Sequence, residues 1–344
     1  FNLKVKLKNY REKWLDFQSW QHAETLKVYV DLVQEKSRST GVPIELMPCM
    51  SPSTVWPEAY GAGQLEQFRR MCKGQDFAPF LNAFSSWFYV RQDCYSMSSE
   101  QKKRLYELGM RESDVGDDLS PITHQKTLEA VEKITANIAK FRRKDSHKVS
   151  YVHLTQNLQV NSWVVQPDAI GLQMLAAWIG GADGVQLYYF PMGYDGRYWR
   201  SAANANDCIA FYEDFRQDAT PVNDEFTLVS RLESASDSEY RNNLVMRVFA
   251  KGGKRLIVLF NFDFLQTQIF DLICNDENKS AQKFVLWSPH EKWHYTFKGE
   301  PAFAADKFPG LTASLPPMSA QVLVIEPFDA LSDYGRAVSA EDST

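Results

Sequence analysis

The stretch QMLAAWIGGADGVQLYYFPMGYDGRYW, residues 173–199, decides the fold class of this chain. Its apolar first part continues a helix that we predict over residues 169–179, and the two glycines at 180–181 are typical of a helix C-terminus. Residues 184–190 form a short apolar run that predicts a buried strand, and a further helix is predicted over residues 198–216. A buried strand between two helices is typical of a parallel sheet with helical crossovers.

The same succession of strand, loop and helix recurs on the N-terminal side of this stretch. It begins with a long amphipathic helix over residues 10–38, where apolar residues recur at helical spacing among charges. Three further apolar runs, each followed by a loop, predict strands over residues 42–50, 77–84 and 149–154. Further helices are predicted over residues 64–73 and 121–143. Four strand-and-helix units in succession predict one parallel sheet within residues 1–220.

The pattern changes at Pro221 to alternating strands without intervening helices. Turn signals such as Gly252-Gly253 and Pro316-Pro317 separate these strands. We therefore predict a fold that is α/β followed by all-β, with an antiparallel β-sandwich over residues 221–328 and a polar tail over residues 329–344. The predicted strands cover residues 244–250, 255–261, 268–272, 284–287, 294–297, 311–315 and 321–326.

The composition argues against two classes of partner. The formal net charge is −5 and the charges are interspersed, so the sequence has no basic stripe for nucleic acid. No window approaches the roughly 18 uncharged apolar residues that a membrane span needs. Metal-ligand spacings and nucleotide-binding fingerprints are absent from the sequence, so we predict neither a metal nor an organic cofactor. The aromatic content of 13% fits a sugar-binding protein, and a large aromatic core explains it equally well.

Several segments resemble parts of glycoside hydrolases. REKWLDFQSW at residues 11–20 is similar to the helix after the fourth barrel strand, and residues 173–199 look like the seventh helix, the eighth strand and the loop that follows. RLIVLFNFDFLQTQIFDL at residues 255–272 and LPPMSAQVLVIEP at residues 315–327 are similar to the sandwich that many glycosidases append to a barrel. The chain thus resembles the C-terminal part of the β-galactosidase-like (β/α)8-barrel superfamily with a C-terminal β-sandwich.

The resemblance implies that the four predicted parallel strands are the fifth to eighth strands of a TIM-type barrel. Four such strands alone leave two open edges and one uncovered apolar face, which water does not tolerate well. We therefore expect another polypeptide, either a second chain or further N-terminal residues, to supply the first half of the barrel.

The resemblance also implies a glycoside hydrolase that acts on a polysaccharide or glycoconjugate, with part of the active site outside this chain. Such enzymes use two carboxyl groups, about 5 Å apart in retaining enzymes and about 6.5 to 9.5 Å apart in inverting ones. In the resembled superfamily the acid follows strand four and the nucleophile follows strand seven. The strand that corresponds to the seventh ends in Thr155-Gln156-Asn157, without a carboxylate. A catalytically silent carbohydrate-binding or structural subunit is therefore the alternative, and the compartment, whether secreted, periplasmic or another, stays open.

Three carboxylates are the candidate catalytic residues, because barrel enzymes place their working residues at the carboxyl ends of the strands. Asp195 lies beside Arg197 and aromatic rings and can accept hydroxyl hydrogens of a sugar, with a loop salt bridge as the alternative. Asp93 follows the sixth strand. Glu45 alternates within the fifth strand and can point into the barrel, with burial as a paired structural acid as the alternative.

The candidate substrate-binding residues come from the same strands and loops. His153 lies within a predicted strand, either as a ligand-binding group near the barrel mouth or as a hydrogen-bonded core histidine. Gln156 and Asn157 can bind sugar hydroxyls or cap the next turn. Arg197 accompanies Asp195. Aromatic rings of these loops can stack on a sugar or pack in the core, and the candidates are Trp56, Trp87, Tyr89, Trp163, Tyr188 and Trp199.

Overall fold

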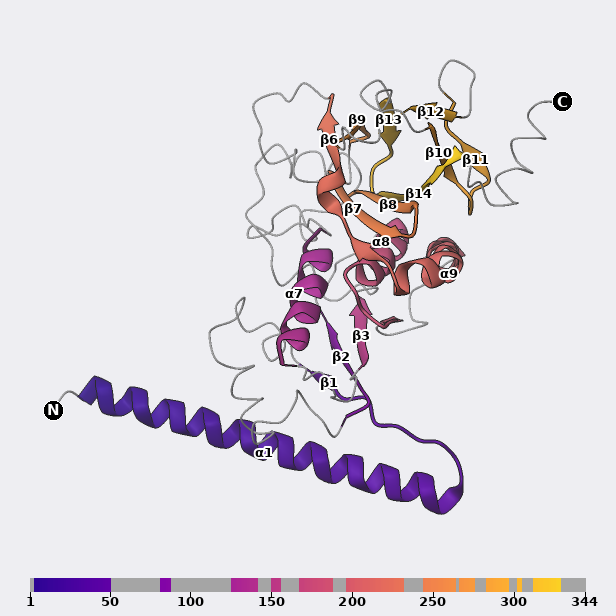
Figure 1. Cartoon of the computed structure of the whole chain (residues 1–344). Coiled ribbons are helices and arrows are strands. Elements are labelled where there is room, and N and C mark those ends of the chain that lie inside the picture. The colour runs from indigo at the N-terminus through magenta and orange to yellow at the C-terminus, as the bar shows by residue number, and fades with distance from the viewer. Residues whose placement is uncertain are drawn as a thin grey trace. The chain divides into compact units, whose positions relative to one another are not determined.

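The chain, as a computed structural model, consists of two compact units, and each is described by itself (Figure 1). The first unit comprises Phe1–Ile122, Lys126–Val164 and Ala176–Gly193, and the second comprises Thr123–Gln125, Val165–Leu175 and Tyr194–Thr344. The structure describes residues 3–50, 81–87, 125–141, 150–155, 167–187, 196–231, 244–263, 266–275, 283–296, 302–304 and 312–328. The helix predicted over residues 64–73 lies outside these ranges.

The first unit contains a four-stranded sheet in which every strand is parallel to its neighbours (Figure 1). The strands are β1 (Cys49–Met50), β2 (Ala83–Trp87), β3 (Ser150–Thr155) and β4 (Gly184–Leu187). Their order in the sheet is β1-β2-β3-β4, which is also their order in the chain. The predicted parallel sheet is confirmed, and it shows no reversal of strand order such as a doubly wound sheet has.

The helices lie where the apolar spacing predicts them. They are α1 (Leu3–Thr40), α7 (Gln125–Phe141), α8 (Pro167–Ile179) and α9 (Gly196–Gln217). In the first unit, side chains of α1, α7 and the last turn of α8 form one buried cluster with the sheet, in which Val30, Ile134 and Ala177 represent the three helices. These helices therefore owe their stability to an apolar face that packs on the strands.

The predicted glycine cap of α8 is confirmed. The backbone N–H of Ala182 donates to the Ala177 carbonyl at 3.0 Å and that of Gly181 to the Trp178 carbonyl at 3.1 Å, the two bonds of a Schellman motif. Gly181 has a φ of 98°, a conformation that side chains disfavour. The chain then enters β4 through Asp183, whose carboxylate accepts a hydrogen bond from the Tyr151 backbone N–H at 2.9 Å.

Two strand predictions need correction. The predicted strand 42–50 is reduced to β1, and Val42 and Ile44 are exposed to solvent. Pro43 and Pro48 lack the backbone N–H that a ladder needs, which accounts for the irregular path before β1. The second predicted strand, 77–84, is shifted, because β2 begins at Ala83 and includes residues 85–87 that were predicted as loop.

The second unit contains two antiparallel sheets. The larger has the order β11-β10-β14-β8-β7-β5, with β12 also paired to β10, and the smaller has the order β13-β9-β6. All seven predicted strands are represented, and β5, β6 and β12 were not predicted. The strands are β5 (Thr220–Pro221), β6 (Phe226–Ser230), β7 (Leu244–Lys251), β8 (Lys254–Asn261), β9 (Gln268–Cys274), β10 (Lys283–Ser288), β11 (Trp293–His294), β12 (Ala302–Ala304), β13 (Thr312–Leu315) and β14 (Ser319–Pro327), and a 3₁₀ turn, η2 (Asn223–Glu225), precedes β6.

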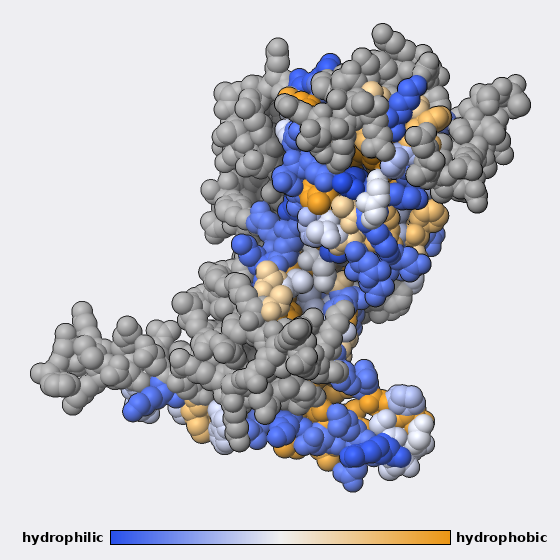
Figure 2. Space-filling view, in the orientation of Figure 1, coloured by the Kyte–Doolittle hydropathy of each residue, from blue (hydrophilic) through white to orange (hydrophobic). Residues whose placement is uncertain are grey.

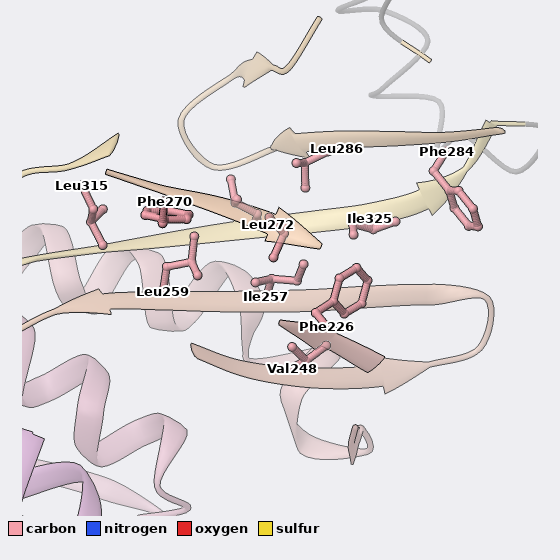
Figure 3. Close-up of a cluster of buried hydrophobic side chains, with 11 residues drawn as sticks. Phe226, Val248, Ile257, Leu259, Phe270, Leu272, Phe284, Leu286, Leu315 and Ile325 are labelled. Atoms are coloured by element: carbon pink, nitrogen blue, oxygen red, sulfur yellow. The ribbon is translucent and has the colours of Figure 1, made fainter. Parts of the chain in front are cut away.

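One hydrophobic cluster joins the two sheets of the second unit (Figure 3). Phe270 and Leu272 of the smaller sheet lie among Ile257, Leu259 and Ile325 of the larger one, and all five are almost completely buried. Burying a side chain of this size contributes about 1.5–3 kcal/mol, so this cluster stabilises the packing of one sheet on the other.

The amide of Asn261, at the end of β8, ties the loops beside this cluster together. Its Nδ2 group donates to the carbonyl oxygens of Gln266, Leu315 and Pro316 at 2.8, 3.0 and 2.9 Å, and its Oδ1 accepts from the Asp263 backbone N–H at 3.0 Å. Asn261 is completely buried. The side chain thus connects a strand of the larger sheet with the end of β13 in the smaller one.

We predict that Asn261→Asp lowers the free energy of unfolding by about 3–5 kcal/mol, because a buried carboxylate would face three carbonyl oxygens. Asn275→Asp is the matched control, since the exposed Asn275 amide also donates to a carbonyl, that of Asp224 at 2.8 Å. The control should cost about 1 kcal/mol in urea denaturation. Equal losses for the two variants would contradict the role assigned to Asn261.

Candidate functional site

The parallel ladder separates the residues of the first-unit sheet into two faces. In this register Ser86 of β2 stands beside His153 of β3 and Val185 of β4, whereas Ser85 stands beside Val152 and Gly184. Because side chains of a strand alternate between faces, each row belongs to one face. We call them the helix-side face (Phe84, Ser86, Tyr151, His153 and Val185) and the open face (Cys49, Ser85, Val152, Gly184 and Gln186).

The helix-side face packs against the helices. Phe84 and Tyr151 stack with ring centroids 5.3 Å apart and belong to the buried cluster that contains Ile134 of α7 and Ala177 of α8. The open face is accessible at its ends, because Cys49 and Gln186 are exposed and Val152 is partly exposed, whereas Ser85 is buried.

His153 lies on the helix-side face, where it is completely buried. Its Nδ1 atom is 2.8 Å from the Tyr151 hydroxyl, and among the described residues its Nε2 atom has no hydrogen-bond partner. Burial lowers the pKa of His153 to about 3 and, as the largest cause, raises that of Tyr151. His153 is therefore a buried, neutral histidine, which fits the core-histidine interpretation, and a role in ligand binding stays a prediction.

Glu45 lies near the amino ends of the strands of the first-unit sheet. It is exposed, it precedes β1 rather than alternating within a strand, and its Oε1 accepts a hydrogen bond from Asn82 Nδ2 at 3.0 Å. Asn82 comes immediately before β2, so both residues lie at the amino ends of the strands. A pocket of about 340 Å³ there is lined by residues that include Gln34, Arg38 and Glu45. Glu45 is thus exposed rather than buried, and its catalytic role stays a prediction.

The other candidates follow the carboxyl ends of the strands. Trp87 is the last residue of β2, and Arg197 and Trp199 lie exposed in the first turn of α9 rather than in a loop. Their roles in substrate binding stay predictions. The remaining candidates lie outside the described residues, and they are Trp56, Tyr89, Asp93, Gln156, Asn157, Trp163, Tyr188 and Asp195.

Sequence reasoning missed Gln186, a polar residue of the open face near the carboxyl end of β4. The alternation of apolar and polar residues in β4 could have identified it, because Val185 and Leu187 lie on one face and Gln186 lies on the opposite face. Ser85, on the same face of β2, was predicted as part of a loop. The Gln186 side chain is exposed and can form hydrogen bonds with hydroxyl groups, whereas Ser85 is buried.

The part of the chain that the structure describes contains no group of three or more His, Cys, Asp or Glu side chains placed to hold a metal ion. None of its helices is long and apolar enough to cross a lipid bilayer.

The comparisons with known proteins give structural likeness only. No protein-family model and no curated protein sequence matches the chain. Similar solved structures are glycoside hydrolases. A maltogenic alpha-amylase, AmyB, from Thermotoga neapolitana is 8% identical with a TM-score of 0.39, covering 88% of this chain and 66% of that one. AbfB, a family 51 alpha-L-arabinofuranosidase from Bifidobacterium longum, is 9% identical with a TM-score of 0.39, covering 90% of this chain and 63% of that one.

A GH30 endoxylanase from Clostridium papyrosolvens is 13% identical with a TM-score of 0.24, covering 79% of this chain and 71% of that one. The chain spans slightly less than two thirds of the length of the amylase and of the arabinofuranosidase. Similarity at these TM-scores carries no conclusion about the activity of this chain.

The buried neutral His153 predicts a specific pH dependence of stability. Its folded pKa of about 3 lies below the ordinary value of 6.5, so between these values the unfolded chain binds a proton that the folded chain does not. The stability of the folded state is therefore unaffected by this group above pH 6.5 and falls as the pH is lowered toward 3. His153→Leu should therefore remove a slope of about 1.4 kcal/mol per pH unit between pH 6 and 4 in urea denaturation. Tyr151→Phe, which keeps the imidazole, should retain the slope. An unchanged slope in His153→Leu would contradict this assignment.

Proposed function

We propose that the chain forms the second half of a (β/α)8 barrel followed by a β-sandwich, and that it takes part in hydrolysis of glycosidic bonds in a polysaccharide or glycoconjugate. The observation that carries this proposal is the sheet of the first unit, with its sequential parallel order, its helix-side face and its open face. The candidate residues Asp93, Gln156, Tyr188 and Asp195 all follow the carboxyl ends of these strands in the sequence. Barrel enzymes place their catalytic groups at this edge.

The proposal requires a polypeptide that completes the barrel. In the described part of the chain, β1 and β4 are the end strands of the sheet and each pairs with one neighbour only. Exposed strand edges bind further strands, and the open face would be covered once the ring is closed. The completing polypeptide would also contribute the acid that follows strand four in the resembled superfamily.

The N-terminal half of α1 supports such an association. Trp14 and Phe17 are 50% and 47% exposed with ring centroids 5.8 Å apart, and Trp20 continues the row, 6.0 Å from Phe17. Further along the helix, Val28 and Leu32 are also exposed, and hydrophobic residues are visible at the surface of its described part in Figure 2. Apolar side chains gathered on one element are typical of a protein interface.

A catalytically silent carbohydrate-binding or structural subunit is the second candidate function. It is favoured by the segment after β3, which reads Gln156-Asn157 where the resembled enzymes carry the nucleophile. In that case the loops after the strands bind a sugar without cleaving it.

The activity is tested by reducing-sugar release from a panel of polysaccharides by the native assembly. We predict that Asp195→Asn lowers kcat by about 10²–10⁴-fold, because a group that transfers a proton in the transition state is lost. Arg197→Gln leaves Asp195 and the acid of the completing polypeptide in place, so it should change KM more than kcat. Wild-type activity in Asp195→Asn would contradict the catalytic assignment, and glycan binding without hydrolysis would select the silent alternative.

The completing polypeptide is tested by the mass of the native assembly in light scattering after size exclusion. We expect a mass well above the 39.5 kDa of this chain. We also expect the double variant Trp14→Glu/Phe17→Glu to dissociate the assembly, because two charges replace exposed apolar rings. Lys13→Glu/Gln21→Glu, at exposed polar positions of the same helix, is the control. A single stable species of 39.5 kDa for the wild type would contradict the proposed half barrel.

A further inference from the structure

The second unit contains a pocket that none of the residues considered above lines. It has a volume of about 480 Å³ and lies between the first turns of α8, the middle of α9, the turn after β10 and the start of β14. All of its described lining residues belong to the second unit, so the pocket does not depend on a completed barrel. Its polar lining includes Asp168, Asn204, Tyr212, Ser288, His290 and Glu291.

The backbone is held in an uncommon conformation at one residue that lines the pocket and at one beside it. Lys292 and Met318 have φ values of 60° and 50°, and they are the only residues other than glycine with positive φ in the described part of the chain. Met318 lines the pocket, and Lys292 follows Glu291 in the turn between β10 and β11. Residues in this region cost free energy and are concentrated at binding sites.

Glu291 is the fixed hydrogen-bond acceptor of the pocket. Its Oε2 accepts a hydrogen bond from Trp293 Nε1 at 2.6 Å, which leaves Oε1 as a further acceptor site. Burial, with a smaller contribution from Glu291, raises the pKa of Cys208 to about 12. The pKa of Tyr212 is raised as well, mainly by burial. Both groups are therefore neutral hydrogen-bond donors at physiological pH.

An aromatic group stands beside these polar atoms. The His290 ring lies 5.6 Å from the Phe211 ring and 6.4 Å from the Tyr212 ring, measured between centroids. The Tyr212 hydroxyl accepts a hydrogen bond from the His290 backbone N–H at 3.3 Å, which fixes the turn. Tyr212 and His290 line the pocket, whereas Phe211 is 52% exposed beside them.

The charges of the lining select the class of ligand. Asp168 and Glu291 are carboxylates, and none of the described lining residues is Lys or Arg. A phosphate or carboxylate ligand would be repelled, whereas hydroxyl groups can donate to the carboxylates and accept from Asn204 and Ser288. A volume of this size suits a ligand of one or two sugar rings.

We propose that this pocket is a binding site for neutral carbohydrate, with hydroxyl groups held by Glu291, Asn204 and Asp168 and a sugar face against the aromatic group. It goes beyond the proposed hydrolysis, because it is a second site that holds a glycan without cleaving it. Such a site would keep the protein on a polysaccharide between cleavage events.

The test is calorimetric titration with cellotriose, xylotriose and maltotriose, carried out on Asp195→Ala so that the proposed cleft does not contribute. Asn204 is an exposed pocket residue of α9, and Asn204→Trp would fill the pocket mouth without altering the core. We expect this substitution to weaken binding of at least one trisaccharide more than tenfold. Asn206→Trp, at an exposed position of α9 outside the described lining, is the matched control and should bind like its parent.

Glucose 6-phosphate should bind at least tenfold more weakly than glucose, because the lining repels an anion. The proposal is overturned if no trisaccharide binds, if Asn204→Trp and Asn206→Trp bind equally well, or if the phosphate ester binds as tightly as glucose. These outcomes are independent of the hydrolysis measurement, since Asn204→Trp should leave the cleavage of a soluble short substrate by otherwise wild-type protein unchanged.

Discussion

The alternation of side chains across four parallel strands is the constraint on which the rest of the structure depends. The helix-side face places Phe84 and Tyr151 against the helices, and the open face leaves Cys49 and Gln186 accessible. Because the strands follow one another without reversal, every crossover helix of the proposed barrel lies on the same face of the sheet. Among the described residues, the helices pack on the helix-side face, and we assign the open face to further polypeptide or ligand.

The same constraint assigns the chemistry. His153 lies on the same face of β3 as Tyr151, and its imidazole forms a hydrogen bond with the buried Tyr151 hydroxyl. Because burial lowers its pKa, the imidazole stays neutral. The proposed hydrolysis therefore assigns proton transfer to other groups. Glu45 lies at the amino ends of the strands, away from the edge where barrel enzymes act. The carboxylates that follow the carboxyl ends, Asp93 and Asp195, are therefore the ones that the proposed hydrolysis retains.

The sequence was sufficient for the parallel order, the helices and most antiparallel strands, because apolar periodicity and glycine signals such as Gly181 report directly on local structure. It failed before β1, where Pro43 and Pro48 interrupt an apolar run that looks like a strand. For His153 it left two interpretations open, because the alternation within one strand does not say which face the helices cover. That assignment needs the packing of residues distant in sequence, here Tyr151 with α7 and α8.

The central claim is that the open face becomes the packed interior of a completed barrel. Cys49 reports on it directly, because its thiol is exposed on that face and forms no disulfide. Alkylation rates, followed by intact mass, should be measured for the isolated chain and for the native assembly. The account predicts rapid modification of Cys49 in the isolated chain and strong protection in the assembly, with Cys274 of the second unit unchanged as a reference. Equal rates at Cys49 in the two samples would contradict it.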